Sequence, residues 1–139
     1  MAERPTVYVV KAALADPRAR TFVLAAQKTM YGGKHIAPGD AVFLFDSENE
    51  GGSGLAARGV VTAARATPRR RGVTRQTPRV DITVTRKAPA KTPLGRAALK
   101  PFRGAAGPQG ELDFKLYRQA TNKIVGVSAA TGAWLDGFF

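Results

Sequence analysis

Five short stretches of the chain carry the β-branched, aromatic and alternating apolar residues that favour strands, and turns rich in Gly and Pro separate them. The predicted strands cover 6–11, 41–46, 55–66, 79–88 and 123–128. The clearest alternation places Val80, Ile82 and Val84 on one face, which predicts a strand with one buried side. The first two strands are almost continuously apolar, and this pattern is typical of strands covered on both faces.

Three other stretches carry helical signals. In 16–30, Asp16 can cap a helix and Pro17 suits its first position. Apolar residues then recur there at helical spacing, at Phe22, Val23, Ala26 and Met30. A short helix is expected over 92–102 with Thr92 as its cap, and a terminal helix over about 130–138. Strands and helices together predict an α+β fold, with 1–139 forming a single domain.

Loops join these elements. The segment 46–54 is acidic and rich in glycine, and 104–110 is a second glycine-containing loop. The segment 67–78 has no periodicity and contains two prolines, which predicts a mobile basic loop.

The composition excludes several kinds of chemistry. The chain has no cysteine and one histidine, His35, so thiol catalysis, cysteine-ligated zinc and a histidine-rich metal site are excluded. We therefore expect no metal and no cofactor. No apolar run approaches the ~18 residues of a membrane helix, and the first residues lack a signal-peptide pattern. These features predict a soluble, cytoplasmic protein with no membrane partner.

Positive charge is concentrated in one block of the chain. Residues 58–103 hold thirteen of the 22 Lys and Arg against a single acid, Asp81, and this excess equals the whole net charge of +12. Cations gathered on one stretch attract a polyanion, because each neutralised phosphate releases counterions. Nucleic acid, either RNA or DNA, is therefore the expected partner.

The expected phosphate contacts are basic residues of this block: Arg69, Arg70, Arg71, Arg75, Arg79, Arg86 and Lys87. Two other interpretations stay open. The run can be a solvated loop with no ligand, or the 69–79 segment can hold an acidic protein partner.

The order of the elements, together with several local motifs, resembles the PUA-like superfamily and, within it, the EVE domain. The motifs are 8-YVVK-11, 38-PGDAVFLFDS-47, 54-GLAARGVVTAARATP-68, 79-RVDITVTRKAPAKTPLGRAALK-100 and 116-LYRQATNKIVGVSAATGAWL-135. The resemblance implies a small, partly open β-barrel with helices over its ends. It also implies a pocket at the barrel mouth that binds a nucleotide or a modified base.

The resemblance places seven residues in that pocket: Lys11, Tyr31, Gly32, Asp46, Ser47, Arg118 and Gln119. Tyr31 takes the position of a tryptophan that EVE domains usually carry, and can offer an aromatic platform for a base. Asp46 and Ser47 can meet the hydrogen-bonding edge of the base. Structural roles are open for the same residues: Tyr31 can plug the barrel end, and Asp46 and Ser47 can cap a turn.

The expected function is therefore a non-catalytic nucleic-acid-binding domain. One alternative is a small hydrolase or nucleotide-processing enzyme that uses the acidic residues of the 46–50 loop. The other is the protein-interaction module with a basic face.

Overall fold

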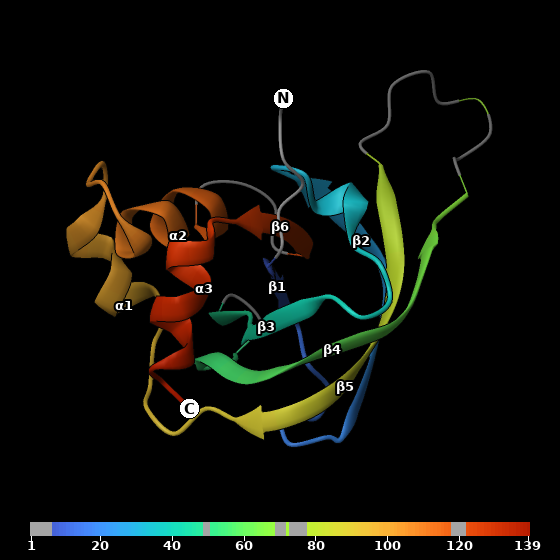
Figure 1. Cartoon of the computed structure of the whole chain (residues 1–139), viewed down its shortest axis with the longest axis horizontal. Coiled ribbons are helices and arrows are strands. Elements are labelled where there is room, and N and C mark those ends of the chain that lie inside the picture. The colour runs from blue at the N-terminus through green and yellow to red at the C-terminus, as the bar shows by residue number, and fades with distance from the viewer. Residues whose placement is uncertain (1–6, 49–50, 69–71, 73–77, 118–121) are drawn as a thin grey trace.

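The structure of the protein is a computed structural model, and it describes residues 7–48, 51–68, 72, 78–117 and 122–139 (Figure 1). The strands are β1 (Val7–Ala12), β2 (Thr21–Met30), β3 (Ala41–Asp46), β4 (Gly54–Ala66), β5 (Arg79–Pro89) and β6 (Lys123–Val127). The helices are η1 (Gly33–His35), α1 (Arg96–Leu99), η3 (Lys100–Phe102), α2 (Pro108–Leu116) and α3 (Ala129–Asp136), where η1 and η3 are 3-10 turns.

The six strands form a closed barrel in the order β1-β3-β4-β5-β2-β6. The pairs β1–β3 and β2–β6 are parallel, and the other neighbouring pairs are antiparallel. The expected β-barrel is therefore confirmed, but it is closed where a partial opening was predicted. The difference comes from β2, which joins β5 to β6 and leaves no strand edge free.

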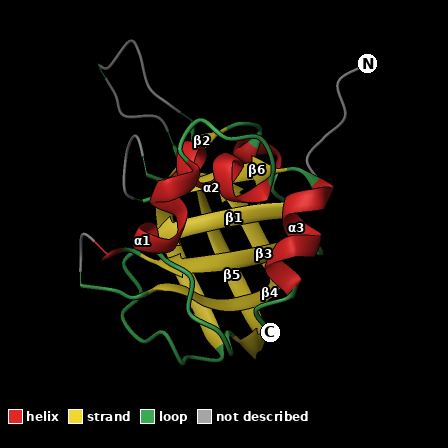
Figure 2. Ribbon diagram, turned by 90° about the vertical axis from the view of Figure 1, so that its left-hand side faces the viewer, coloured by secondary structure: helices red, strands yellow, loops and turns green. Residues whose placement is uncertain are grey.

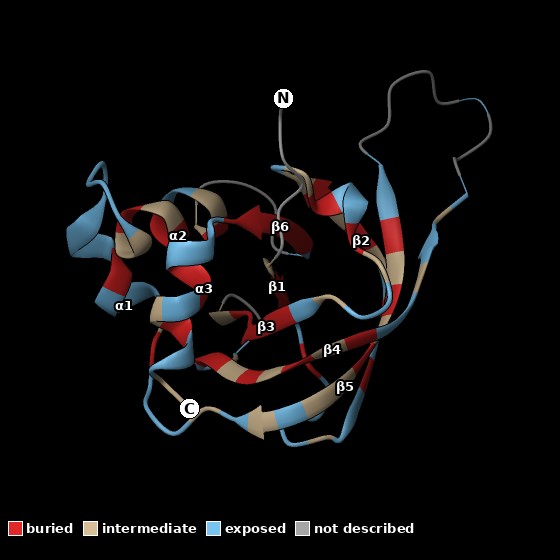
Figure 3. Ribbon diagram, viewed as in Figure 1, coloured by how far each residue is buried: buried red, intermediate tan, exposed pale blue. Residues whose placement is uncertain are grey.

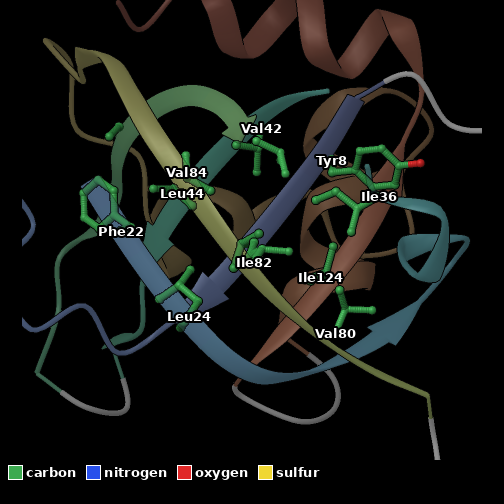
Figure 4. Close-up of a cluster of buried hydrophobic side chains, with 14 of the residues drawn as sticks. Tyr8, Phe22, Leu24, Ile36, Val42, Leu44, Val80, Ile82, Val84 and Ile124 are labelled. Atoms are coloured by element: carbon green, nitrogen blue, oxygen red, sulfur yellow. The ribbon is translucent and has the colours of Figure 1, made fainter. Parts of the chain in front are cut away.

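Two hydrophobic clusters lie on the two faces of the barrel wall. Inward-facing residues such as Tyr8, Leu44 and Ile124 fill the barrel (Figure 4). Their sequence neighbours Val9 and Phe45 face outward and pack in a second cluster with residues of the helices. This arrangement explains the continuous apolar character of β1 and β3, because both faces of these strands are covered (Figure 3).

Helices were expected over the ends of the barrel, but they pack against its side. Leu99 of α1, Leu112 and Leu116 of α2 and Leu135 of α3 all belong to the outer cluster. Figure 2 shows these helices in front of β1 and β3. At one end of the barrel, Ile36 belongs to the inner cluster and follows η1.

The helix predicted over 16–30 is wrong, because this region contains β2. Phe22 and Leu24 are buried whereas Val23 and the residue after Leu24 are exposed, which is a period of two. The alanines of this segment also suit a helix, but pairing with β5 and β6 overrides that preference. A shift of register between Leu24 and Gln27 obscures the alternation in the sequence.

The other predicted elements differ mainly in extent. The strands predicted over 41–46, 55–66 and 79–88 are confirmed, and the last strand covers 123–127. The helix expected over 92–102 is shortened to α1 and η3, and its N-cap is Gly95 instead of Thr92. The predicted loop 104–110 runs into α2, which begins at Pro108. Most of the basic loop predicted over 67–78 lies outside the described residues.

Candidate nucleic-acid interface

An exposed pair of aromatic rings lies where β2 ends. Tyr31 directly follows β2 and is 39% exposed, and Phe114 on α2 is 48% exposed. Their ring centroids are 5.9 Å apart and the ring planes are tilted by 59°. Aromatic rings that stay in water at this degree of exposure can cover a further flat apolar group, such as a base.

The backbone after β2 turns sharply to present Tyr31. Tyr31 and Gly32 both adopt left-handed conformations, with φ of 51° and 83°. A left-handed conformation is uncommon for a residue with a side chain and is enriched at functional sites. Gly33 then lies so close to β6 that a side chain there would collide with the carbonyl of Ile124. The Gly-Gly pair therefore holds the ring of Tyr31 close to the barrel wall.

A lysine is fixed beside the aromatic pair. The Nζ atom of Lys115 lies 5.0 Å from the centre of the Tyr31 ring. The same atom donates hydrogen bonds to the carbonyl of Gly126 and to a carboxylate oxygen of Glu111, both at 2.8 Å. Burial opposes ionisation of Glu111, but hydrogen bonds from Lys115, Thr131 and Ser128 outweigh it and lower the pKa of this carboxyl. Lys115 is thus held in place before any ligand arrives.

Two hollows flank the aromatic pair. A hollow of about 240 Å³ is lined by Thr29, Met30, Tyr31, Gly32, Gly33, Lys34 and Pro78. A hollow of about 540 Å³ has Phe114, Glu111 and Ser128 in its lining, with most of the 104–108 segment. Tyr31 lines the first and Phe114 lines the second, so the two rings form a ridge between them.

A second group of polar residues lies further along β6, on the outer face of the barrel wall. Lys11 stands opposite Lys123, and Lys123 is also in register with Lys28 of β2. Three lysines therefore lie side by side, one on each of the neighbouring strands β2, β6 and β1. Lys11 and Lys123 are almost fully buried, and Lys28 is partly buried. The resemblance placed Lys11 in a pocket that binds a nucleotide, and in the structure its side chain is buried.

The two buried ammonium groups have lowered pKa values. Burial lowers the pKa of Lys11, and the carboxylate of Glu48 partly opposes this effect. The Nζ atom of Lys11 donates to the carbonyl of Leu116 at 2.9 Å and lies 4.4 Å from the centre of the Tyr117 ring. Burial together with the positive charge of Lys11 lowers the pKa of Lys123 to about 8.

Glu48 ties this lysine group to the helices. Its carboxylate accepts hydrogen bonds from the backbone N–H of Arg96 at 3.0 Å and from the hydroxyl of Tyr117 at 2.9 Å. Burial and the hydrogen bond to Glu48 raise the pKa of the Tyr117 hydroxyl, so that it stays protonated and donates. Glu48 is committed to these partners, which weakens the hypothesis that the 46–50 loop performs acid–base catalysis.

Asp46 ends β3 beside the last residue of β1, and Ser47 follows it. The carboxylate of Asp46 accepts a hydrogen bond from the backbone N–H of Leu14 at 3.0 Å, a turn-capping contact. The hydroxyl of Ser47 is fully buried and has no hydrogen-bond partner among the described residues. Leaving a buried hydroxyl without a hydrogen-bond partner is unfavourable.

The structure separates the residues expected in one pocket into two groups. Tyr31 and Gly32 lie where the carbonyl of Tyr31 accepts a hydrogen bond from the N–H of Gly126. Lys11 pairs with Lys123, which precedes Gly126 by three residues on β6. Asp46 pairs with Ala12, the residue after Lys11. Three residues of a strand span roughly 10 Å. The expected contact of Tyr31, Asp46 and Ser47 with one base is therefore not assembled.

Some of the remaining predicted residues lie outside the described part of the chain, and the others lie within it. Arg118 and Gln119 lie outside the described residues, between Tyr117 and Asn122. Arg69, Arg70, Arg71 and Arg75 also lie outside them. Arg79 donates to the carbonyl of Ala26 at 2.8 Å, Arg86 donates to that of Arg18 at 3.0 Å, and Lys87 is exposed.

Sequence reasoning missed three residues of these groups: Phe114, Lys115 and Lys123. Phe114 and Lys115 lie in a segment whose helical character was not predicted, so the exposed face of α2 could not be foreseen. Lys123 begins a strand that was predicted correctly, but its burial depends on segments far away in the chain. Trp134 packs on the outer cluster, as expected of a core residue.

Two wider features of the described residues bear on function. Within them, no group of three His, Asp or Glu side chains is arranged to hold a metal ion. No helix in the described part of the chain is long and apolar enough to cross a membrane.

Comparison with known proteins supports the fold. No family model and no curated protein sequence matches the chain. The chain is similar to a crystal structure of human THYN1 protein in complex with DNA that contains 5-methylcytosine. The TM-score is 0.61, the sequence identity is 11%, and the match covers 94% of this chain and 95% of the other. This likeness confirms the EVE/PUA-like fold that the sequence motifs predicted.

Proposed function

We propose that the protein is a non-catalytic nucleic-acid-binding domain that holds one base against the ring of Tyr31. The observation that carries the proposal is the exposed pair Tyr31–Phe114 with Lys115 fixed beside it. Two further facts support it. The net charge is +12, which favours a polyanion, and a protein of the same fold has been crystallised with DNA.

The chemistry of the pair suits an unpaired base. Stacking on an aromatic ring stabilises a bound base by roughly 1–3 kcal/mol and works for every base. Lys115 lies beside the Tyr31 ring, and Lys34 lines the smaller hollow. Both lysines can contact the phosphates that flank the base. Because Met30 and Pro78 add apolar surface to that hollow, a methyl group on the base can be accommodated there.

The test compares variants at Tyr31. Replacing Tyr31 with Ala is expected to weaken binding of a single-stranded oligonucleotide by roughly 1–3 kcal/mol, the usual loss for one stacked base. Tyr31→Phe keeps the ring and is expected to bind nearly as well as the wild type. Fluorescence anisotropy with labelled oligonucleotides measures both, and circular dichroism checks that each variant is folded.

Phe102 offers a matched control, because it is also 39% exposed and does not line either hollow beside Tyr31. Phe102→Ala is expected to leave the affinity unchanged. Equal affinities of the wild type and Tyr31→Ala would contradict the proposed platform.

A modified base is the finer part of the proposal. It is tested with paired oligonucleotides that carry cytosine or 5-methylcytosine at one position, in DNA and in RNA. Tighter binding of the methylated strand, lost in Tyr31→Ala, is the expected result. Equal binding of both strands would mean that the domain does not distinguish 5-methylcytosine from cytosine.

A further inference from the structure

Three arginines, Arg18, Arg20 and Arg86, come together where β2 begins and β5 nears its end, and Lys87 follows Arg86 along β5. The backbone N–H of Arg86 donates to the carbonyl of Arg20 at 2.8 Å, which continues the antiparallel pairing of Thr21 with Thr85. Arg20 therefore stands directly opposite Arg86. The guanidinium of Arg86 reaches the carbonyl of Arg18 at 3.0 Å.

Within the described part of the chain, ion pairs do not compensate the charge of this cluster. Among the described residues, none of the four cations lies within ion-pair distance of a carboxylate. The nearby acid Asp16 accepts a hydrogen bond from the backbone N–H of Arg18 at 2.9 Å. Like charges directly opposite each other on neighbouring strands repel, so a bound anion would relieve this repulsion.

The cluster is also positioned for binding. Arg18, Arg20 and Lys87 are exposed. The hydrogen bond to a neutral carbonyl orients the guanidinium of Arg86 and leaves its charge intact. A guanidinium has five N–H donors, so donors remain that can form paired hydrogen bonds to a phosphate.

Pairing of the strands creates the cluster from two regions of the chain. Arg86 and Lys87 belong to the basic block, but Arg18 and Arg20 come from the first 57 residues, where basic and acidic residues are equal in number. Charge counting along the sequence therefore does not reveal it.

We infer that this cluster binds backbone phosphates of a nucleic acid at a place separate from the Tyr31 platform. The inference rests on the proposed function and adds the second contact. Arg20 directly precedes β2 and Tyr31 directly follows it, and a strand of ten residues spans roughly 30 Å. Nine base-pair steps of B-DNA cover about the same length, so a duplex of a dozen base pairs with an unpaired base at one end can reach both places.

The experiment removes two exposed cations while leaving Arg86 to hold the Arg18 loop. In the double variant Arg20→Ser with Lys87→Ser, the slope of log affinity against log salt for a 12-base-pair duplex with one unpaired terminal base is expected to decrease by about 1.8, which is 0.9 per lost phosphate contact. The control is Lys91→Ser with Lys100→Ser, which removes the same charge from exposed positions elsewhere. The control is expected to keep the wild-type slope. Equal changes in both double variants, or no change in either, would overturn the inference.

Inorganic tripolyphosphate separates this inference from the proposed function, because it has no base. Wild-type protein is expected to show tripolyphosphate-dependent NMR shifts of the Arg20 and Arg86 Nε–H signals. Binding of tripolyphosphate at the cluster, without binding of any nucleic acid, would keep the anion site and overturn the proposed function. The opposite outcome is nucleic-acid binding that depends on Tyr31 while the salt slope stays unchanged in Arg20→Ser with Lys87→Ser. It would keep the proposed function and overturn the anion site.

Discussion

Lys11 and Lys123 are opposite each other on neighbouring strands, and both are almost fully buried. Burial of an ammonium group is unfavourable, and two such groups side by side also repel each other. The contacts of Lys11 with the carbonyl of Leu116 and the ring of Tyr117 offset part of this cost. The lowered pKa of Lys123 is the electrostatic result of the same arrangement.

The pKa of Lys123 predicts how stability changes with pH. In the unfolded chain a lysine keeps its proton up to about pH 10.4, whereas folded Lys123 releases it near pH 8. Between these values the unfolded state binds more protons, so the free energy of unfolding is expected to rise with pH. Urea denaturation of the wild type and Lys123→Met at pH 7, 8, 9 and 10 measures this, and the variant should show the smaller rise.

Lys91→Met is the control, because Lys91 is exposed. It should keep the wild-type dependence on pH. If the free energy of unfolding of Lys123→Met rose with pH as much as that of the wild type, groups other than Lys123 would cause the rise.

One irregular element of the barrel is β2, which carries a bulge between Leu24 and Gln27. Ala26 lies within it and has a left-handed φ of 53°. Its backbone N–H donates to the carboxylate of Asp81 at 2.6 Å, and the hydroxyl of Thr67 donates to the same oxygen at 2.9 Å. These hydrogen bonds, with that from Ala26 the largest, lower the pKa of Asp81. The only acid of the basic block therefore holds a bulge in place.

Substitutions at the bulge test this account. Ala26→Gly is expected to stabilise the protein by about 1 kcal/mol, because glycine adopts the left-handed conformation without the cost that alanine carries. Ala25→Gly is the matched control: it lies in the same strand without a positive φ, and a glycine there is expected to destabilise by roughly 0.5–1 kcal/mol. Thermal and urea denaturation give both values, and the same sign for the two variants would contradict the assignment.

At the scale of the whole molecule, the helices cover only part of the barrel. They pack on the outer cluster beside β1, β3 and β6 (Figures 1 and 2). Val23, near the start of β2, is exposed to solvent. Cations at both ends of β5, Arg79 and Lys87, are exposed as well. The exposed cations on the part of the barrel that no helix covers, together with the net charge of +12, favour long-range attraction of a polyanion.

The basic loop is expected to contribute to this attraction. Replacing Arg69, Arg70 and Arg71 with Ala should reduce the slope of log affinity against log salt by up to about 0.9 for each lost duplex phosphate contact, or about 0.7 for a single strand. Anisotropy titrations at several salt concentrations measure it. A slope that stays the same would indicate that these three arginines do not touch the nucleic acid.

The sequence by itself determined the strands β1, β3, β4, β5 and β6, the location of the positive charge and the absence of thiol chemistry. These properties depend on composition and on local alternation, which neighbouring residues express directly. The motif order also indicated the EVE/PUA-like barrel, and the structural comparison confirms it.

Only the tertiary structure decided how distant segments meet. The helical signals of 16–30 lose to pairing with β5 and β6, so the element that closes the barrel is a strand. Lys11 is buried and donates a hydrogen bond to a residue 105 positions later in the chain. Tyr31 likewise meets Phe114 on a helix that local sequence did not reveal. Such contacts depend on the register of strands and the packing of helices, and the pattern of nearby residues does not contain that information.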